Sequence, residues 1–91
     1  MSDLILHLEA KYWHDINNGI KPEEYRERTP YWEKRLKAKQ FDNVIFCLGY
    51  PAKDDMSKRI IRPYKGYKEK TIIHPHFGNK PTDVFAIDTR G

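Results

Sequence analysis

Apolar residues in this sequence form short runs, and the longest covers only residues 44–48. Runs of this length that are rich in β-branched and aromatic side chains are typical of strands rather than of helices. Gly49 and Pro51 follow this run and predict its end. We therefore expect a central strand at residues 43–50, and a fold that is organised around a sheet.

Similar short runs predict the remaining strands. We expect strands at residues 4–8, 23–28, 59–64, 71–73 and 84–87, with a turn or bulge at 65–68 and a loop at 74–81. Pro63 cannot donate a hydrogen bond to a neighbouring strand, so the strand that contains it should lie at an edge or carry a bulge.

Two segments with helical spacing separate the first three strands. Tyr12 and Ile16 are spaced i, i+4 and share one helix face, and Gly19 offers a C-terminal stop. Thr29 is a suitable N-cap for the second segment, and Pro30 suits its first turn. Each helix should therefore be short.

The fold class follows from the order of these elements and from chain length. Ninety-one residues are too few for two separate cores, but they suffice for one small domain. The strands most simply form one closed or nearly closed sheet. We predict an α+β fold, a five- to six-stranded mixed β-barrel with two flanking helices, as a single domain over residues 1–91.

A charged junction lies between the first predicted helix and the second predicted strand. Residues 19–26 carry the spacing Gly-x-Lys-x-x-Glu-x-Arg. The proline that follows Lys21 disfavours the helical conformation there and should hold the lysine at a bend. Alternation along the strand places Glu24 and Arg26 on one face and Tyr25 on the other, where it should pack inward.

This spacing resembles the signature of the ASCH family, whose members are small β-barrels related to PUA domains. The match is Gly19, Lys21, Glu24 and Arg26, and the order of strands and helices is similar over the whole chain. In that family the motif residues line a cleft inferred to take RNA, DNA or a nucleoside. The resemblance implies a PUA-like barrel that binds RNA or single-stranded nucleic acid in a cleft lined by Lys21, Glu24 and Arg26.

One bacterial branch of the family, the N4-acetylcytidine amidohydrolases, implies an enzymatic alternative. That branch uses the motif lysine with a nucleophilic threonine three residues later, and with a glutamate from another strand. Here Lys21 is kept, but Glu24 stands at the threonine position and cannot simply replace the hydroxyl. If the protein is a hydrolase of RNA or of a modified nucleoside, Lys21 and Glu24 are the expected catalytic pair.

Basic and aromatic residues adjoin in the second predicted helix. Residues 34–39 hold four cations, and the chain as a whole has a net charge of +4. Such cations could contact phosphates while a neighbouring ring stacks on a base. The further predicted nucleic-acid-binding residues are Tyr31, Trp32, Lys34, Arg35 and Lys37, with His74 and His76 at the rim. An ordinary solvated helix face is the alternative.

Two other interpretations of the charged residues stay open. Lys21, Glu24 and Arg26 could form a structural ion cluster at one end of the barrel, although desolvation removes much of the gain from such a cluster. His74 and His76 resemble metal ligands, but two histidines fall short of the three protein ligands that a catalytic zinc needs. We expect no metal and no cofactor.

Cysteine content and hydropathy suggest a location. The single cysteine, Cys47, excludes an intrachain disulfide and fits a reducing compartment. No apolar stretch approaches the roughly 20 residues of a membrane helix, and the N-terminus lacks the features of a signal peptide. We predict a cytoplasmic monomer without a membrane partner. Its partner should be RNA, single-stranded nucleic acid or a nucleoside, and a small protein-interaction or inhibitor module is the remaining alternative.

Overall fold

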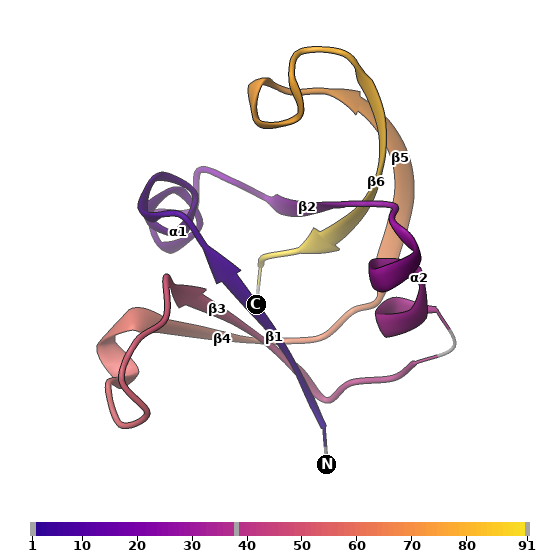
Figure 1. Ribbon diagram of the computed structural model, residues 1–91. Helices are drawn as coiled ribbons and strands as arrows, with labels where there is room; N and C mark the ends of the chain where they lie inside the picture. The colour runs from indigo at the N-terminus through magenta and orange to yellow at the C-terminus, as the bar shows by residue number, and fades with distance from the viewer. Residues whose placement is uncertain (1, 38, 91) are drawn as a thin grey trace. The chain divides into compact units, whose positions relative to one another are not determined.

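The computed structural model describes residues 2–37 and 39–90, which form six strands and two α-helices (Figure 1). In chain order the elements are β1 (Asp3–Leu8), α1 (Ala10–Asn17), β2 (Glu23–Glu27), α2 (Pro30–Leu36), β3 (Asn43–Leu48), η1 (Met56–Lys58), β4 (Arg59–Pro63), β5 (Tyr67–Ile73), η2 (Pro75–Phe77) and β6 (Pro81–Asp88), where η marks a short 3₁₀ helix. No described helix is both long and apolar enough to cross a membrane.

The described strands pair into two three-stranded sheets, ordered β1-β3-β4 and β2-β6-β5. Each sheet belongs to one compact unit of the chain. Unit 1 holds residues 2–22, 41–64 and 89–90, and unit 2 holds residues 23–37, 39–40 and 65–88. The expectation of a single domain over the whole chain stays a prediction.

The predicted five- to six-stranded β-barrel is wrong, because neither sheet closes on itself within residues 2–37 and 39–90. Closure requires every strand to pair along both of its edges. In each sheet only the middle strand does so, which is β3 in unit 1 and β6 in unit 2. The apolar alternation of the sequence reports which strands exist, whereas it does not report where pairing ends.

Unit 1 is built around β3, which pairs parallel with β1 and antiparallel with β4. Strict alternation along β1 buries Leu4, Leu6 and Leu8 on one face. The Trp13 Nε1 of α1 donates a hydrogen bond to the carbonyl oxygen of Phe46 at 2.9 Å. The helix is therefore fastened to the middle strand of its own unit.

Two details predicted for unit 1 are confirmed. Pro63 ends β4, which is an edge strand of the β1-β3-β4 sheet. Cys47 is buried, with 1% of its surface exposed. Burial raises the pKa of the Cys47 thiol, and the nearby charge of Arg59 opposes this shift only in part. A buried thiol with a raised pKa is a poor nucleophile, in keeping with a packing role.

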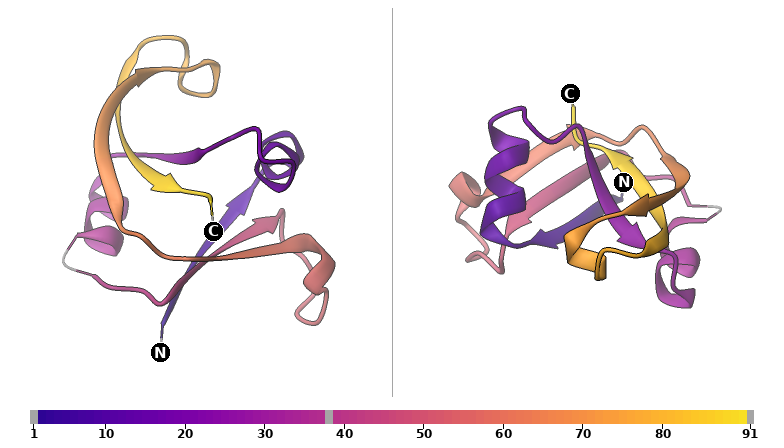
Figure 2. Two further views of the ribbon diagram at one scale, coloured as in Figure 1. Left: turned by 180° about the vertical axis from the view of Figure 1, so that it is seen from behind. Right: turned by 90° about the horizontal axis from the view of Figure 1, so that it is seen from above.

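Unit 2 is built around β6, which pairs antiparallel with both β2 and β5. Four consecutive residues of β6 are buried, namely Val84, Phe85, Ala86 and Ile87. Figure 2 shows β5 and β6 curving side by side toward the η2 turn that joins them. Helix α2 begins as predicted, since the Thr29 hydroxyl oxygen accepts a hydrogen bond from the Trp32 backbone N–H at 3.3 Å.

Candidate functional site

Glu24 and Arg26 lie on the same face of β2, as the alternation predicts. Arg26 Nη2 is 3.3 Å from Glu24 Oε2, and the two side chains are only 20% and 8% exposed. Their cross-strand neighbours on β6 are the buried residues Ile87 and Phe85. Charges in such partly buried surroundings interact more strongly than charges in water, so the carboxylate can hold the guanidinium in one orientation.

The opposite face of β2 carries a second polar group around Tyr25. The Tyr25 hydroxyl donates a hydrogen bond to Glu23 Oε1 at 3.4 Å, and Lys70 Nζ lies 2.6 Å from the same oxygen. Burial, followed by the charge of Glu23, raises the pKa of the tyrosine hydroxyl. Contrary to the expectation that Tyr25 packs inward, it is only half-buried, whereas Glu24 is buried.

Four residues of β2 and α2 form an arginine–aromatic cluster, which consists of Arg26, Tyr31, Trp32 and Arg35. The guanidinium carbons of Arg26 and Arg35 lie 5.3 Å and 5.6 Å from the centroid of the Trp32 ring. The Tyr31 ring meets the Trp32 ring edge-on, with centroids 5.1 Å apart. Both guanidiniums are thus within the distance at which a cation is attracted to an aromatic face.

The two rings of this cluster differ in access. Trp32 is half-buried and has both guanidiniums against it, whereas the side chain of Tyr31 is 62% exposed. The structure therefore favours Tyr31 over Trp32 as a ring on which a base could stack. Trp32 is better suited to holding the cations in place.

Arg35 is held by rings rather than by a carboxylate. Its guanidinium carbon is 5.9 Å from the centroid of Tyr31, in addition to its contact with Trp32. Within residues 2–37 and 39–90 it forms no ion pair, and its buried Nε has no hydrogen-bond partner there. A buried donor without a partner calls for an explanation, and the pull of a nearby bound anion is one.

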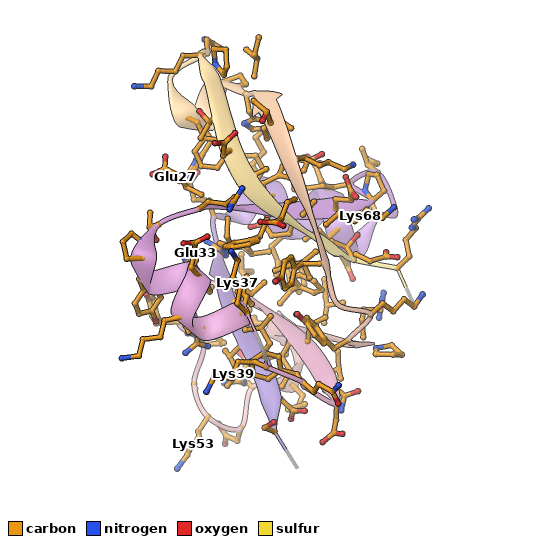
Figure 3. The ribbon with its side chains drawn as sticks, turned by 90° about the vertical axis from the view of Figure 1, so that its right-hand side faces the viewer. Glu27, Glu33, Lys37, Lys39, Lys53 and Lys68 are labelled. Carbon is orange, nitrogen blue, oxygen red and sulfur yellow. The ribbon has the colours of Figure 1, made fainter. Side chains whose placement is uncertain are left out.

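The basic residues on the rest of α2 are not equivalent. Lys37 Nζ lies 3.1 Å from Glu33 Oε1, which Arg28 Nη2 also approaches at 3.2 Å (Figure 3). These contacts, led by the hydrogen bond from Lys37, lower the pKa of Glu33. Lys34 is exposed and forms no ion pair within the described part of the chain. Lys34 is therefore better placed than Lys37 to meet an outside phosphate.

The two histidines of the predicted rim lie at η2, and they join Tyr25 rather than the arginine–aromatic cluster. The ring of His74 lies 6.2 Å from that of Tyr25, and its Nδ1 accepts a hydrogen bond from the His76 backbone N–H. The His76 ring contacts Phe77 at 5.0 Å. No group of three His, Cys, Asp or Glu side chains suited to a metal ion occurs among the described residues.

Lys21 belongs to unit 1, whereas Glu24 and Arg26 belong to unit 2. A single cleft lined by all three residues therefore stays a prediction. Within unit 1, Lys21 Nζ lies 5.3 Å from the centroid of the Tyr12 ring. The lysine also lines a hollow of about 220 Å³, together with two arginines that the sequence did not single out, Arg62 and Arg90. No local motif marks those arginines, because each comes from a different segment of the chain.

No family model, no curated protein and no solved structure matches this chain. The resemblance to the ASCH family through residues 19–26 therefore stays a prediction. The function has to be inferred from the contacts of the described side chains.

Proposed function

We propose that this protein binds RNA or single-stranded nucleic acid through the surface that β2 and α2 form in unit 2. The observation that supports this proposal is the arginine–aromatic cluster. Arg26 and Arg35 both lie against Trp32, while the adjacent Tyr31 ring is 62% exposed. Cations beside an accessible ring are the two components of sequence-tolerant binding to single strands.

The arginines of the cluster would contact the phosphates. A guanidinium offers several N–H donors in a planar fork, which suits the oxygens of a phosphate group. Arg26 is oriented by Glu24, and Arg35 is oriented by two rings. Less side-chain entropy is lost on binding when the cations are already held, so the contact becomes more favourable.

The Tyr31 ring would receive a base. Its position is supported by the edge-on contact with Trp32, yet most of the side chain is open to solvent. Stacking of one base on an aromatic ring contributes roughly 1–3 kcal/mol by alanine substitution. Only an unpaired base can offer its face in this way, which favours a single strand over a duplex.

The shape of α2 also argues against recognition of a duplex. The helix has seven residues, of which the first is Pro30. A helix that reads base edges enters the major groove and carries several side chains on one exposed face. On α2 the outward aromatic and basic residues are few, and Lys37 is paired with Glu33.

Location and oligomeric state belong to the same proposal. A cytoplasmic location is supported by the lone Cys47, which is buried as a free thiol and fits a reducing compartment. We propose a monomer, and light scattering coupled to size-exclusion chromatography tests this directly. A mass of twice 10.9 kDa would contradict it.

The test of binding is fluorescence anisotropy with a labelled oligonucleotide of about 16 nucleotides, the upper end of single-strand site sizes. Single-stranded RNA, single-stranded DNA and an RNA duplex are compared at two salt concentrations. Arg35→Gln should weaken binding and flatten the salt dependence by about one unit of slope. Lys53→Gln removes the same charge from an exposed loop residue and is the control (Figure 3).

Two results would contradict the proposal. One is the absence of binding to every single strand at low salt. The other is binding that Arg35→Gln and Lys53→Gln weaken to the same extent, because the effect would then reflect net charge rather than the cluster.

A further inference from the structure

We infer that unit 1 carries a separate binding site for a phosphate group, in the hollow lined by Lys21, Arg62 and Arg90. This inference does not depend on the proposed function of the arginine–aromatic cluster. The ligand class is a phosphate monoester or inorganic phosphate, and the same chemistry would serve a free ion, a nucleotide or the phosphorylated end of a strand.

The charge of the lining points to an anion. Three of the residues around the hollow are cations, and none of the described lining residues is acidic. They come from three distant segments, which are the turn after α1, strand β4 and the residues after β6. A concave surface lined by charges of one sign concentrates the field and raises the local concentration of the opposite ion.

Backbone hydrogen bonds bring two of these cations together. Thr89 donates from its hydroxyl to the carbonyl oxygen of Lys21, and from its backbone N–H to the carbonyl oxygen of Pro22 at 3.0 Å. Thr89 is itself buried, with 4% of its surface exposed. The neighbouring Arg90 is therefore held beside the Lys21 segment by main-chain contacts, even though the two side chains repel each other.

The third cation is positioned by the sheet. Arg62 lies on β4 opposite Val44 of the middle strand β3, and its Nη1 donates to the carbonyl oxygen of Ile61 at 3.1 Å. The turn that carries Lys21 is fixed in the same way, since the backbone N–H groups of Ile20 and Lys21 donate to the carbonyl oxygen of Asp15. The electrostatic cost of gathering the cations is thus met by the fold, before any ligand binds.

The size of the hollow limits what can enter. Its volume of about 220 Å³ exceeds the roughly 30 Å³ share of one water molecule. It is smaller than the roughly 300–1,000 Å³ of pockets that enclose whole small-molecule ligands. A phosphate group with the first atoms attached to it fits between these limits. Two guanidiniums and an ammonium also match the several terminal oxygens of a phosphate better than the two of a carboxylate.

The test is a titration of the full chain with inorganic phosphate, followed by the backbone amide shifts in NMR spectra. Ionic strength is held constant with chloride, so that general screening does not vary. We expect saturable shifts at Gly19, Lys21 and Thr89, while the amides of Tyr31 and Arg35 stay unchanged. Failure of any amide around the hollow to shift in a saturable way would overturn the inference.

Variants then assign the shifts to the cations. The double change Arg62→Gln and Arg90→Gln should weaken phosphate binding by at least about tenfold, since each lost charge-assisted hydrogen bond is worth about that factor or more. The matched control Lys53→Gln and Lys65→Gln removes the same charge from exposed residues and should change the affinity by less than about twofold. Equal loss in both doubles would overturn the site.

Two further measurements keep the inference testable and identify the source of the phosphate. Arg90→Gln alone changes an exposed side chain, so folding is preserved, and it should weaken binding by about threefold or more. A nucleoside 5′-monophosphate and its unphosphorylated nucleoside are compared, as are 5′-phosphorylated and 5′-hydroxyl oligonucleotides. Binding must require the phosphate in each pair, and equal binding without it would refute the assignment. Tyr31→Ala should leave all of these affinities unchanged, which separates this site from the proposed nucleic-acid surface.

Discussion

The cations of unit 2 are held by aromatic rings, whereas those of unit 1 are held by the backbone. Arg26 and Arg35 lie against Trp32 and leave the exposed Tyr31 beside them. The unit 1 cations instead line a hollow whose walls are fixed by hydrogen bonds of the main chain.

This difference predicts different ligands. A surface of rings and cations can take a chain of nucleotides, because bases stack and phosphates pair along its length. A hollow of cations with few rings can take only a compact anion. Changes that remove a ring should therefore affect unit 2 alone, and changes that remove a backbone-held cation should affect unit 1 alone.

The largest effect is expected where a charge loses its partner in partly buried surroundings. Glu24→Gln removes the charge that Arg26 faces at 3.3 Å and leaves a guanidinium that is only 20% exposed. We expect a loss of about 2–3 kcal/mol in the free energy of unfolding, somewhat below the cost of breaking a fully buried pair. Urea unfolding measures it. Lys58→Gln, which breaks an exposed pair with Asp55, is the control and should change stability little.

The next effect concerns the exposed ring of unit 2. Tyr31→Ala should weaken binding of single-stranded RNA by roughly 1–3 kcal/mol while the salt dependence stays the same, because a ring and no charge is lost. The matched control is Tyr50→Ala in unit 1. That ring is 85% exposed and stacks on His7 at 4.1 Å, but it has no part in the cluster. If both alanine variants bound RNA equally well, base stacking on Tyr31 would be excluded.

Exchange of one arginine from each unit tests their independence. Arg35→Gln should reduce RNA affinity and leave phosphate binding in the hollow unchanged, and Arg62→Gln should do the reverse. Each loss is expected to reach about tenfold for its own ligand. Anisotropy for RNA and NMR titration for phosphate give the two readouts. A single arginine change that weakened both ligands together would show that one surface serves both.

A smaller effect follows from the ionisation of Tyr25. Its folded pKa is raised above 10.0, mainly by burial and then by Glu23, so the neutral hydroxyl is favoured in the folded state. The stability it contributes is fully present below pH 10 and is lost as the pH rises through the higher folded pKa. Tyr25→Phe should therefore unfold less steeply with pH above 10 than the natural chain. Thermal unfolding between pH 9 and about 11.5 measures this, and identical slopes would contradict it.

The smallest effect distinguishes two lysines of α2. Lys37 is paired with Glu33 at 3.1 Å, whereas Lys34 forms no ion pair within the described residues. We expect Lys34→Gln to lower the salt dependence of RNA binding more than Lys37→Gln does. Equal slopes for both variants would mean that the pairing is lost when RNA binds.

Local features of the chain could be predicted from the sequence. The alternation that places Glu24 and Arg26 on one face of β2 is a property of any strand. The Thr29 cap of α2 depends on a backbone N–H only three residues away. Burial of Cys47 follows from the apolar run around it. Each of these depends on neighbours within a few residues, and for that reason the printed order of residues is sufficient.

The order of strand pairing could not be predicted in the same way. Every strand pattern is compatible with several partners, so the closed sheet expected here was wrong, and two separate sheets are observed. The same uncertainty hid the hollow of unit 1. Lys21 belongs to a recognisable motif, but Arg62 and Arg90 have no local signal that links them to it.

By itself, then, the sequence determined where strands and helices form and which side chains share a face of one element. The tertiary structure decided that Trp32 has two guanidiniums against it, that His74 joins Tyr25, and that three distant cations surround one hollow. The physical reason is the range of the forces involved. Backbone sterics and capping act over a few residues, whereas strand pairing joins residues that are dozens of positions apart, through contacts that a local pattern does not encode.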